Sequence, residues 1–103
     1  MSSLSEIYFN YNKAIQQAER LDTIARRLKQ AADGDMEGIL NDVYRVWKSD
    51  SAPQYIQKGQ KVKTDIVTAS KKLNQIASAI RTIARQVRDA ELEARRIANE
   101  RNS

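Results

Sequence analysis

The feature that most constrains the fold is a short joint between two long stretches with heptad spacing. The joint has the sequence WKSDSAP and occupies residues 47–53. On both sides of it apolar residues recur at alternating steps of three and four residues, and Gly59 alone interrupts the alternation in the second stretch. An average step of 3.5 residues keeps apolar side chains on one face of a helix, so each stretch predicts a long helix that packs against another helix.

The apolar stripes are read directly from the sequence. The first comprises Leu4, Ile7, Tyr11, Ala14, Ala18, Leu21, Ala25, Leu28 and Ala32. The second comprises Tyr55, Val62, Ile66, Ala69, Leu73, Ile76, Ile80, Ile83, Val87, Ala90, Ala94 and Ile97. Two stripes with one break predict an all-α fold, an antiparallel helical hairpin that forms a single domain over residues 1–103.

Local signals set the ends of the helices. Ser3 followed by Glu6 is a capping box, in which the serine oxygen accepts from an early backbone N–H. Ser51 followed by Gln54 repeats this arrangement, and Pro53 is tolerated in a first helical turn. We therefore expect helix one over about 3–47, a turn over about 48–51 and helix two over about 52–99.

The weakest place in the first helix is the segment with the sequence DGDMEG, residues 33–38. It could end that helix and start a short one. Apolar residues continue with helical spacing as far as Trp47, however, which favours one helix. Each internal glycine costs about 1 kcal/mol relative to alanine, so we expect a local weakening.

Folding about the joint brings together residues whose numbers sum to roughly 98 and places small side chains opposite large ones, such as Ala25 opposite Leu73 and Ala18 opposite Ile80. A register shifted by half a heptad gives comparable pairs.

Additional apolar residues flank the stripes, namely Tyr8, Ile15 and Ile24 in the first helix and Ala77, Ala79 and Ala84 in the second. Broad stripes favour pairing of two hairpins into a four-helix bundle, and a thickened monomeric hairpin is the alternative. The expected pairing interface comprises Ile66, Leu73, Ile76, Ile80 and Ile83.

Composition argues against catalysis. The chain has no Cys or His, which removes thiol nucleophiles, imidazole acid–base chemistry and the usual zinc ligands. With three Gly it lacks a glycine-rich phosphate loop. We expect no enzymatic activity, no catalytic residues, no metal and no cofactor.

No stretch reaches the roughly 20 apolar residues of a membrane span, and the N-terminus does not have the pattern of a secretory signal peptide.

The positive charge is concentrated in the second half. Residues 1–46 carry six Lys or Arg and seven Asp or Glu, whereas residues 47–103 carry twelve and six. The heptad frame assigns outward positions to Lys61, Lys71, Arg81, Arg85, Arg88, Arg95 and Arg96. Such a face favours solubility, and two alternatives stay open: a cytoplasmic basic coiled-coil adaptor for nucleic acid or an acidic protein, and a peripheral membrane helix pair. The aromatic residues do not interleave with the basic ones, which makes nucleic acid an unlikely partner.

With the joint between two long helices, the chain resembles the WXG family of small type VII (ESX/Ess-type) secretion substrates, which are ESAT-like helical hairpins of about this length. The turn motif of that family corresponds here to Trp47, Ser49 and Tyr55, with Ser49 in place of the usual glycine. The family's secretion motif, an apolar residue followed by an acid and further apolar residues, corresponds to Val87, Glu91, Ala94 and Ala98. The tyrosine often found at its first position is replaced by Val87.

The resemblance implies a function and a location. It implies export by the type VII route without a secretory signal peptide, from a cytoplasmic pool. It implies partners as well: a homodimer or a heterodimer with a related helical hairpin, which includes the N-terminal domain of a secreted toxin, and the type VII machinery itself. Periodicity by itself predicts only a protein that binds other helices.

Overall fold

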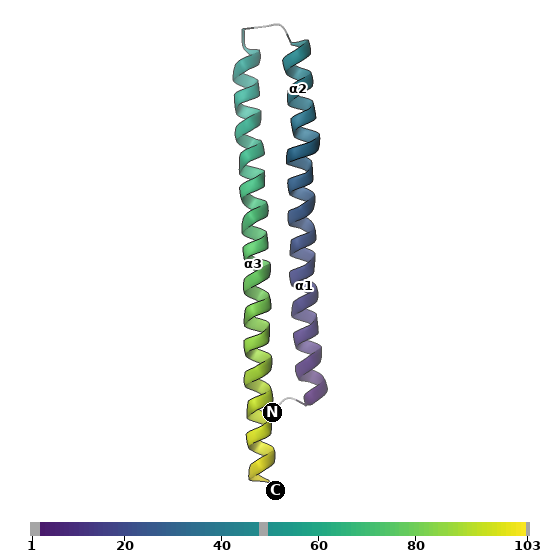
Figure 1. The fold of residues 1–103 in the computed structure, drawn as a ribbon, viewed down its shortest axis with the longest axis vertical. Coiled ribbons are helices and arrows are strands. Elements are labelled where there is room, and N and C mark those ends of the chain that lie inside the picture. The colour runs from purple at the N-terminus through teal and green to yellow at the C-terminus, as the bar shows by residue number, and fades with distance from the viewer. Residues whose placement is uncertain (1–2, 48–49, 103) are drawn as a thin grey trace. The chain divides into compact units, whose positions relative to one another are not determined.

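The computed structural model describes residues 3–47 and 50–102. In order along the chain it has the α-helix α1 (Leu4–Gln30), the π-helix η1 (Ala31–Met36), the α-helix α2 (Glu37–Val46) and the α-helix α3 (Ala52–Arg101) (Figure 1). The described residues contain no β-strand. The predicted all-α class is therefore confirmed, and α3 extends two residues beyond its predicted end.

The first predicted cap is present at the start of α1. The backbone N–H of Glu6 donates to Ser3 Oγ at 3.2 Å, and the same hydroxyl lies 3.2 Å from Glu6 Oε1, to which it donates. The backbone N–H of Ile7 donates to the Ser3 carbonyl at 3.0 Å. Ser3 thus satisfies amide groups that have no partner within the first turn of a helix.

The glycine-containing segment neither ends the helix nor remains α-helical. Residues 31–36 form a π-helix whose flanking residues, Gln30 and Glu37, both keep right-handed helical dihedral angles. A π-turn contains more residues than an α-turn. In agreement, the inward residues here follow one another at steps of four, from Leu28 to Ala32, Met36 and Leu40. The predicted local weakness therefore corresponds to a wider turn within a continuous helical run.

The joint ends α2 and begins α3. Trp47 has an extended backbone with φ −89° and ψ 105°, and its N–H donates to the Val43 carbonyl at 2.9 Å. The Ser51 carbonyl accepts from the N–H groups of Gln54 and Tyr55 at 3.1 and 3.3 Å. Helix α3 begins at Ala52, as predicted. Ser49, the third residue of the expected turn motif, lies outside the described residues, as does Lys48.

The contacts of the chain divide it into two compact units. The terminal unit comprises Met1–Leu21 and Gln75–Ser103, and the turn unit comprises Asp22–Asn74. Helices α1 and α3 contribute residues to both. In the turn unit, α2 and the first part of α3 run side by side from the joint (Figure 1), and Lys63 Nζ lies 2.9 Å from Glu37 Oε2. In the terminal unit, the Arg88 guanidinium lies over the Tyr11 ring at 4.5 Å from its centroid. Both contacts are close to the predicted register.

The interior is built mainly from alanine. Among the described residues, the buried apolar ones are Ile7, Ala18, Ala25, Ala32, Ala52, Ala77 and Ala84. Ser70 is also buried, and its hydroxyl donates to the Val67 carbonyl at 2.7 Å. Small side chains allow two helices to approach closely, but they remove little apolar area from water. Apart from Ile7, the larger aliphatic side chains of the described residues are consequently left half-buried or exposed.

This packing corrects the face that was predicted for helix two. We expected Ile76 and Ile83 in the main stripe and Ala77 and Ala84 beside it. Instead Ala77 and Ala84 are buried, whereas Ile76 is 49% exposed and Ile83 57% exposed. The helix is rotated by about one residue because its line of small residues, which includes Ser70, permits closer contact than the isoleucines do. Within the described residues, none of the helices is long and apolar enough to cross a membrane.

Candidate protein-binding surface

The terminal unit carries an open apolar groove between its two helical segments. The groove has a volume of about 260 Å³. Its lining residues are Ile7, Asn10, Tyr11, Ala14, Ile80, Ile83, Ala84, Val87, Arg88 and Glu91. Ile7 and Ala84 are buried, whereas Ile83 and Val87 are 57% and 49% exposed. The small alanines create the hollow, and the larger residues of α3 leave apolar surface beside it that is open to solvent.

The exposed apolar surface continues along α3 as a strict heptad line. We call the part of this line that lies in the terminal unit the outer stripe; it consists of Ile76, Ile83, Ala90 and Ile97, and Val62 and Ala69 of the turn unit occupy the same heptad position in the sequence. All six are exposed, with Val62 at 49% and Ile97 at 39%. An isolated exposed aliphatic residue is ordinary on a protein surface. A line of them at coiled-coil spacing indicates a surface shaped for another helix.

The residues of the predicted pairing interface divide between two environments. Ile66, Leu73 and Ile80 are half-buried, on the side of α3 next to its buried line. Ile76 and Ile83 are exposed and belong to the outer stripe. Sequence analysis treated these five residues as one stripe. The half-buried set and the exposed set each recur every seven residues, so periodicity alone does not distinguish them. Only the location of the small residues distinguishes the inner face from the outer one.

The predicted secretion motif lies at the end of the groove. Val87 and Glu91 both line the groove, and Glu91 is half-buried. Ala94 is exposed and Ala98 is half-buried. The structure thus brings the first two motif residues together on one surface, one turn apart along α3.

Arg88 was not predicted as part of this surface, yet it forms one side of the groove. Its guanidinium stacks on Tyr11 and its Nε donates to Asp89 Oδ1 at 3.0 Å. The hydrogen bond that Arg88 donates to Asp89 raises the pKa of Arg88. The contact between Tyr11 and Arg88 agrees with the predicted register, but it was missed because the heptad frame assigned Arg88 to an outward position.

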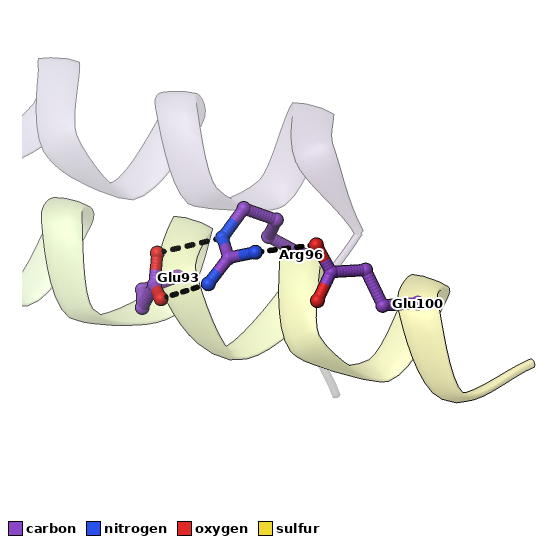
Figure 2. A network of polar contacts seen from close by, with 3 residues as sticks. All are labelled: Glu93, Arg96 and Glu100. Carbon is purple, nitrogen blue, oxygen red and sulfur yellow. Dashed lines mark hydrogen bonds and ion pairs between the residues drawn. The ribbon is translucent and has the colours of Figure 1, made fainter.

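The end of α3 carries a polar network on its surface, shown in Figure 2. Arg96 donates to Glu93 at 2.5 and 3.0 Å and to Glu100 at 2.5 Å. The hydrogen bond from Arg96 lowers the pKa of Glu93. The cluster has a net charge of −1 and connects successive turns of the helix.

The predicted basic face is only partly outward. Lys61, Lys71, Arg85 and Arg96 are exposed, as expected. Arg81, Arg88 and Arg95 are instead half-buried beside the helix–helix contact. These three recur every seven residues, and a long arginine side chain at such a position can cover apolar surface with its aliphatic stem. They therefore do not form a continuous outer cationic face with the lysines.

The turn unit has a second apolar hollow at the joint. It has a volume of about 360 Å³ and is lined by Tyr44, Trp47, Ala52, Pro53, Ile56 and Gln57. The Trp47 and Tyr55 rings lie 4.7 Å apart between centroids, with 35° between their planes. Trp47 and Tyr55, two residues of the predicted turn motif, are thus in contact. Trp47 is 41% exposed, so the ring is also accessible to a partner.

The described part of the chain has no cluster of three or more acidic side chains suited to a metal ion. Comparisons with known proteins do not extend these observations: no family model, no curated protein and no solved structure matches the chain.

Proposed function

We propose that this chain is a non-enzymatic, WXG-like component of a type VII secretion system. In this proposal it leaves the cell by that route, or it acts as a pairing and targeting partner for another secreted helical-hairpin protein, such as the N-terminal domain of a toxin. Its binding surface is the groove of the terminal unit together with the outer stripe of α3.

The observation that carries the proposal is the contrast between the interior and the surface. Among the described residues, six of the seven buried apolar ones are alanines, whereas Ile76, Ile83 and Ile97 of α3 are exposed at heptad spacing. A chain that served only its own fold would place its largest apolar residues inside. The arrangement therefore supports a protein whose large side chains become buried when a further helix binds.

The joint supports the more specific part of the proposal. Trp47 and Tyr55 form an aromatic contact between the end of α2 and the first turn of α3. This contact lies at the middle of the chain, where the WXG family has its turn. Ser49, which stands where the family usually has glycine, lies outside the described residues. The support therefore comes from Trp47 and Tyr55.

The alternative of a basic adaptor has less support. The half-buried positions of Arg81, Arg88 and Arg95 divide the positive charge between two sides of α3. A binding site for nucleic acid generally combines a continuous positive groove with aromatic residues on which bases stack. Here Tyr11 is already covered by Arg88.

Export can be tested in the producing bacterium. We expect the wild-type protein in the culture medium when the type VII ATPase is active, and only in the cells when it is inactivated. Glu91→Ala should fold normally but remain in the cells, because Glu91 is the acid of the proposed secretion motif. Glu93→Ala, which removes a neighbouring carboxylate, is the matched control and should be exported. Export of the wild type without the ATPase would refute the proposal.

A further inference from the structure

Trp47 borders two hollows of the turn unit that differ in polarity. The first is the apolar hollow of about 360 Å³ at the joint, whose other lining residues are Tyr44, Ala52, Pro53, Ile56 and Gln57. The second has a volume of about 210 Å³, and its other lining residues are Ser51, Gln54, Tyr55 and Lys58. We call the second one the polar hollow. Among the described residues that line it, Lys58 is positively charged and none is acidic.

The two hollows lie on opposite faces of the start of α3. Successive residues of a helix are rotated by about 100°, which places residues 52, 53, 56 and 57 on one side of α3 and residues 51, 54, 55 and 58 on the other. The Trp47 ring packs against the Tyr55 ring, with 4.7 Å between centroids, and forms the boundary between the hollows. Successive side chains of an extended peptide point to opposite sides. An extended peptide that crosses Trp47 would therefore place neighbouring side chains in different hollows.

The apolar hollow suits one large apolar side chain. Two aromatic rings line it and are accessible, since Tyr44 is 73% exposed and Trp47 is 41% exposed. None of its described lining residues carries a charge. Its volume is near the lower end of the roughly 300–1,000 Å³ found for small-molecule sites, which gives room for a single side chain rather than for a helix. Aliphatic and aromatic side chains gain most from leaving water for such a site.

The polar hollow suits a carboxylate. Lys58 is exposed, and within the described residues no acidic side chain forms an ion pair with it. Arg45 and Lys63 of the same unit, by contrast, already have carboxylate partners. Gln54 and Tyr55 add side chains with N–H and O–H donors. A carboxylate in this hollow would be next to a positive charge and to hydrogen-bond donors.

We propose that the joint binds an extended acidic peptide, in which an aliphatic or aromatic side chain enters the apolar hollow and a neighbouring acidic residue pairs with Lys58. Apolar contact on one side of Trp47 and charge complementarity on the other select this ligand. The site goes beyond the proposed function, because it lies in the turn unit and uses neither the groove nor the outer stripe.

The fluorescence of Trp47 reports occupancy of the site, because the chain has one tryptophan. The probe is a hexapeptide with acetylated and amidated ends, in which leucine and glutamate stand between glycine and serine residues. Titration should shift the emission to shorter wavelength and saturate with a Kd on the order of 100 μM, since the contact is small. A peptide with serine in place of leucine should bind about tenfold more weakly, because it leaves the apolar hollow empty.

A double-mutant cycle tests the charge pair. Lys58→Gln should weaken binding of the leucine–glutamate peptide by about threefold. It should have no effect on a peptide with glutamine in place of glutamate, which lacks the charge. Lys61→Gln is the matched control: it removes the same charge from the next turn of α3, where the residue lines neither hollow, and should leave the Kd unchanged. Both lysines are exposed, so both variants should keep the helical circular dichroism spectrum.

A titration without any change in Trp47 emission overturns the inference. Equally strong binding of the serine peptide overturns it as well, and so does a Lys58→Gln variant that still distinguishes glutamate from glutamine. Vesicles of phosphatidylcholine and phosphatidylserine are titrated in parallel. If the emission shifts with vesicles but not with the peptide, the exposed rings contact a lipid surface and the peptide site is refuted.

Discussion

Gly59 lies directly against the side chain of Leu40, and a methyl group added to Gly59 would be 2.4 Å from Leu40 Cδ2. The glycine is the one interruption in the apolar alternation of the second stretch, and this contact is its physical reason. Without a side chain at residue 59, α3 and α2 approach closely in the turn unit, and Leu40 fills the space that a β-carbon would otherwise occupy.

This contact predicts that substitution by alanine has different effects on stability at Gly38 and at Gly59. Gly38→Ala should raise the free energy of unfolding by about 1 kcal/mol, because nothing lies within 4 Å of the new methyl group and alanine favours the helix. Gly59→Ala should gain clearly less, or lose stability, because Leu40 must move. Denaturant unfolding measures both, and an equal gain at the two sites would contradict the contact.

The ion pair between Glu37 and Lys63 predicts a pH dependence. The hydrogen bond and positive charge of Lys63 lower the pKa of Glu37 below its ordinary value. Stability from this pair is therefore present above the unfolded pKa of about 4.3 and is lost as the pH falls through the lower folded value. Glu37→Gln should reduce the melting temperature at pH 7 and have little effect once the pH lies below both the unfolded and the folded pKa of Glu37. Asp35→Asn, at an exposed neighbour, is the control.

The aromatic contact at the joint predicts a moderate effect of Trp47→Ala. A fully buried tryptophan would cost roughly 3–5 kcal/mol when truncated. Because Trp47 is 41% exposed and is held mainly by Tyr55, we expect about 1–2 kcal/mol in denaturant unfolding. A double-mutant cycle with Tyr55→Ala should give a coupling energy of about 0.5–1.5 kcal/mol. Independent effects of the two changes would mean that the rings do not stabilise each other.

Two isoleucines three residues apart should separate folding from association. Ile80 is half-buried beside the interior, so Ile80→Asp should unfold the protein by placing a carboxylate where it lacks a counter-charge. Ile83 is 57% exposed, so Ile83→Asp should preserve the helical circular dichroism spectrum while abolishing association. If Ile83→Asp associates like the wild type, the outer stripe is not the interface.

Binding to nucleic acid should be absent at physiological salt. Since Arg81, Arg88 and Arg95 are half-buried, the exposed lysines of α3 do not form a continuous phosphate-binding surface with them. Titration of labelled single- and double-stranded oligonucleotides should reveal no sub-micromolar complex. A tight complex whose affinity falls steeply with salt would instead favour the basic adaptor.

Sequence analysis predicted the helices better than the faces that they bury. The ends at Ser3 and Ala52 depend on local capping chemistry, which is encoded in neighbouring residues. The burial of Ala77 and Ala84 in place of Ile76 and Ile83 depends on how closely two distant segments approach. Apolar periodicity alone does not contain that information, because both pairs of residues fit a helical stripe.

The candidate surface was predicted in part for the same reason. Val87 and Glu91 were selected by spacing and do lie together on the groove. Arg88 and Tyr11 were not recognised as a pair because Arg88 was assigned to the outward face of helix two, although the predicted register brings the two residues close together. The exposed fraction of Trp47 was also unpredictable, because it depends on the angle at which the joint presents the ring.

The π-helix at residues 31–36 makes the chain tolerant of a change in length at one place. A wider turn holds one residue more than the α-helical turn it replaces, and removal of a single residue such as Asp33 would allow an ordinary α-helix to form there. Because the removed residue is the one that the wider turn accommodates, α2 would keep its orientation relative to the preceding turn. Leu40 would still face Gly59, and Glu37 would still face Lys63. The same deletion within a regular α-helical turn would instead rotate everything that follows by about 100° and cost the chain its fit between α2 and α3.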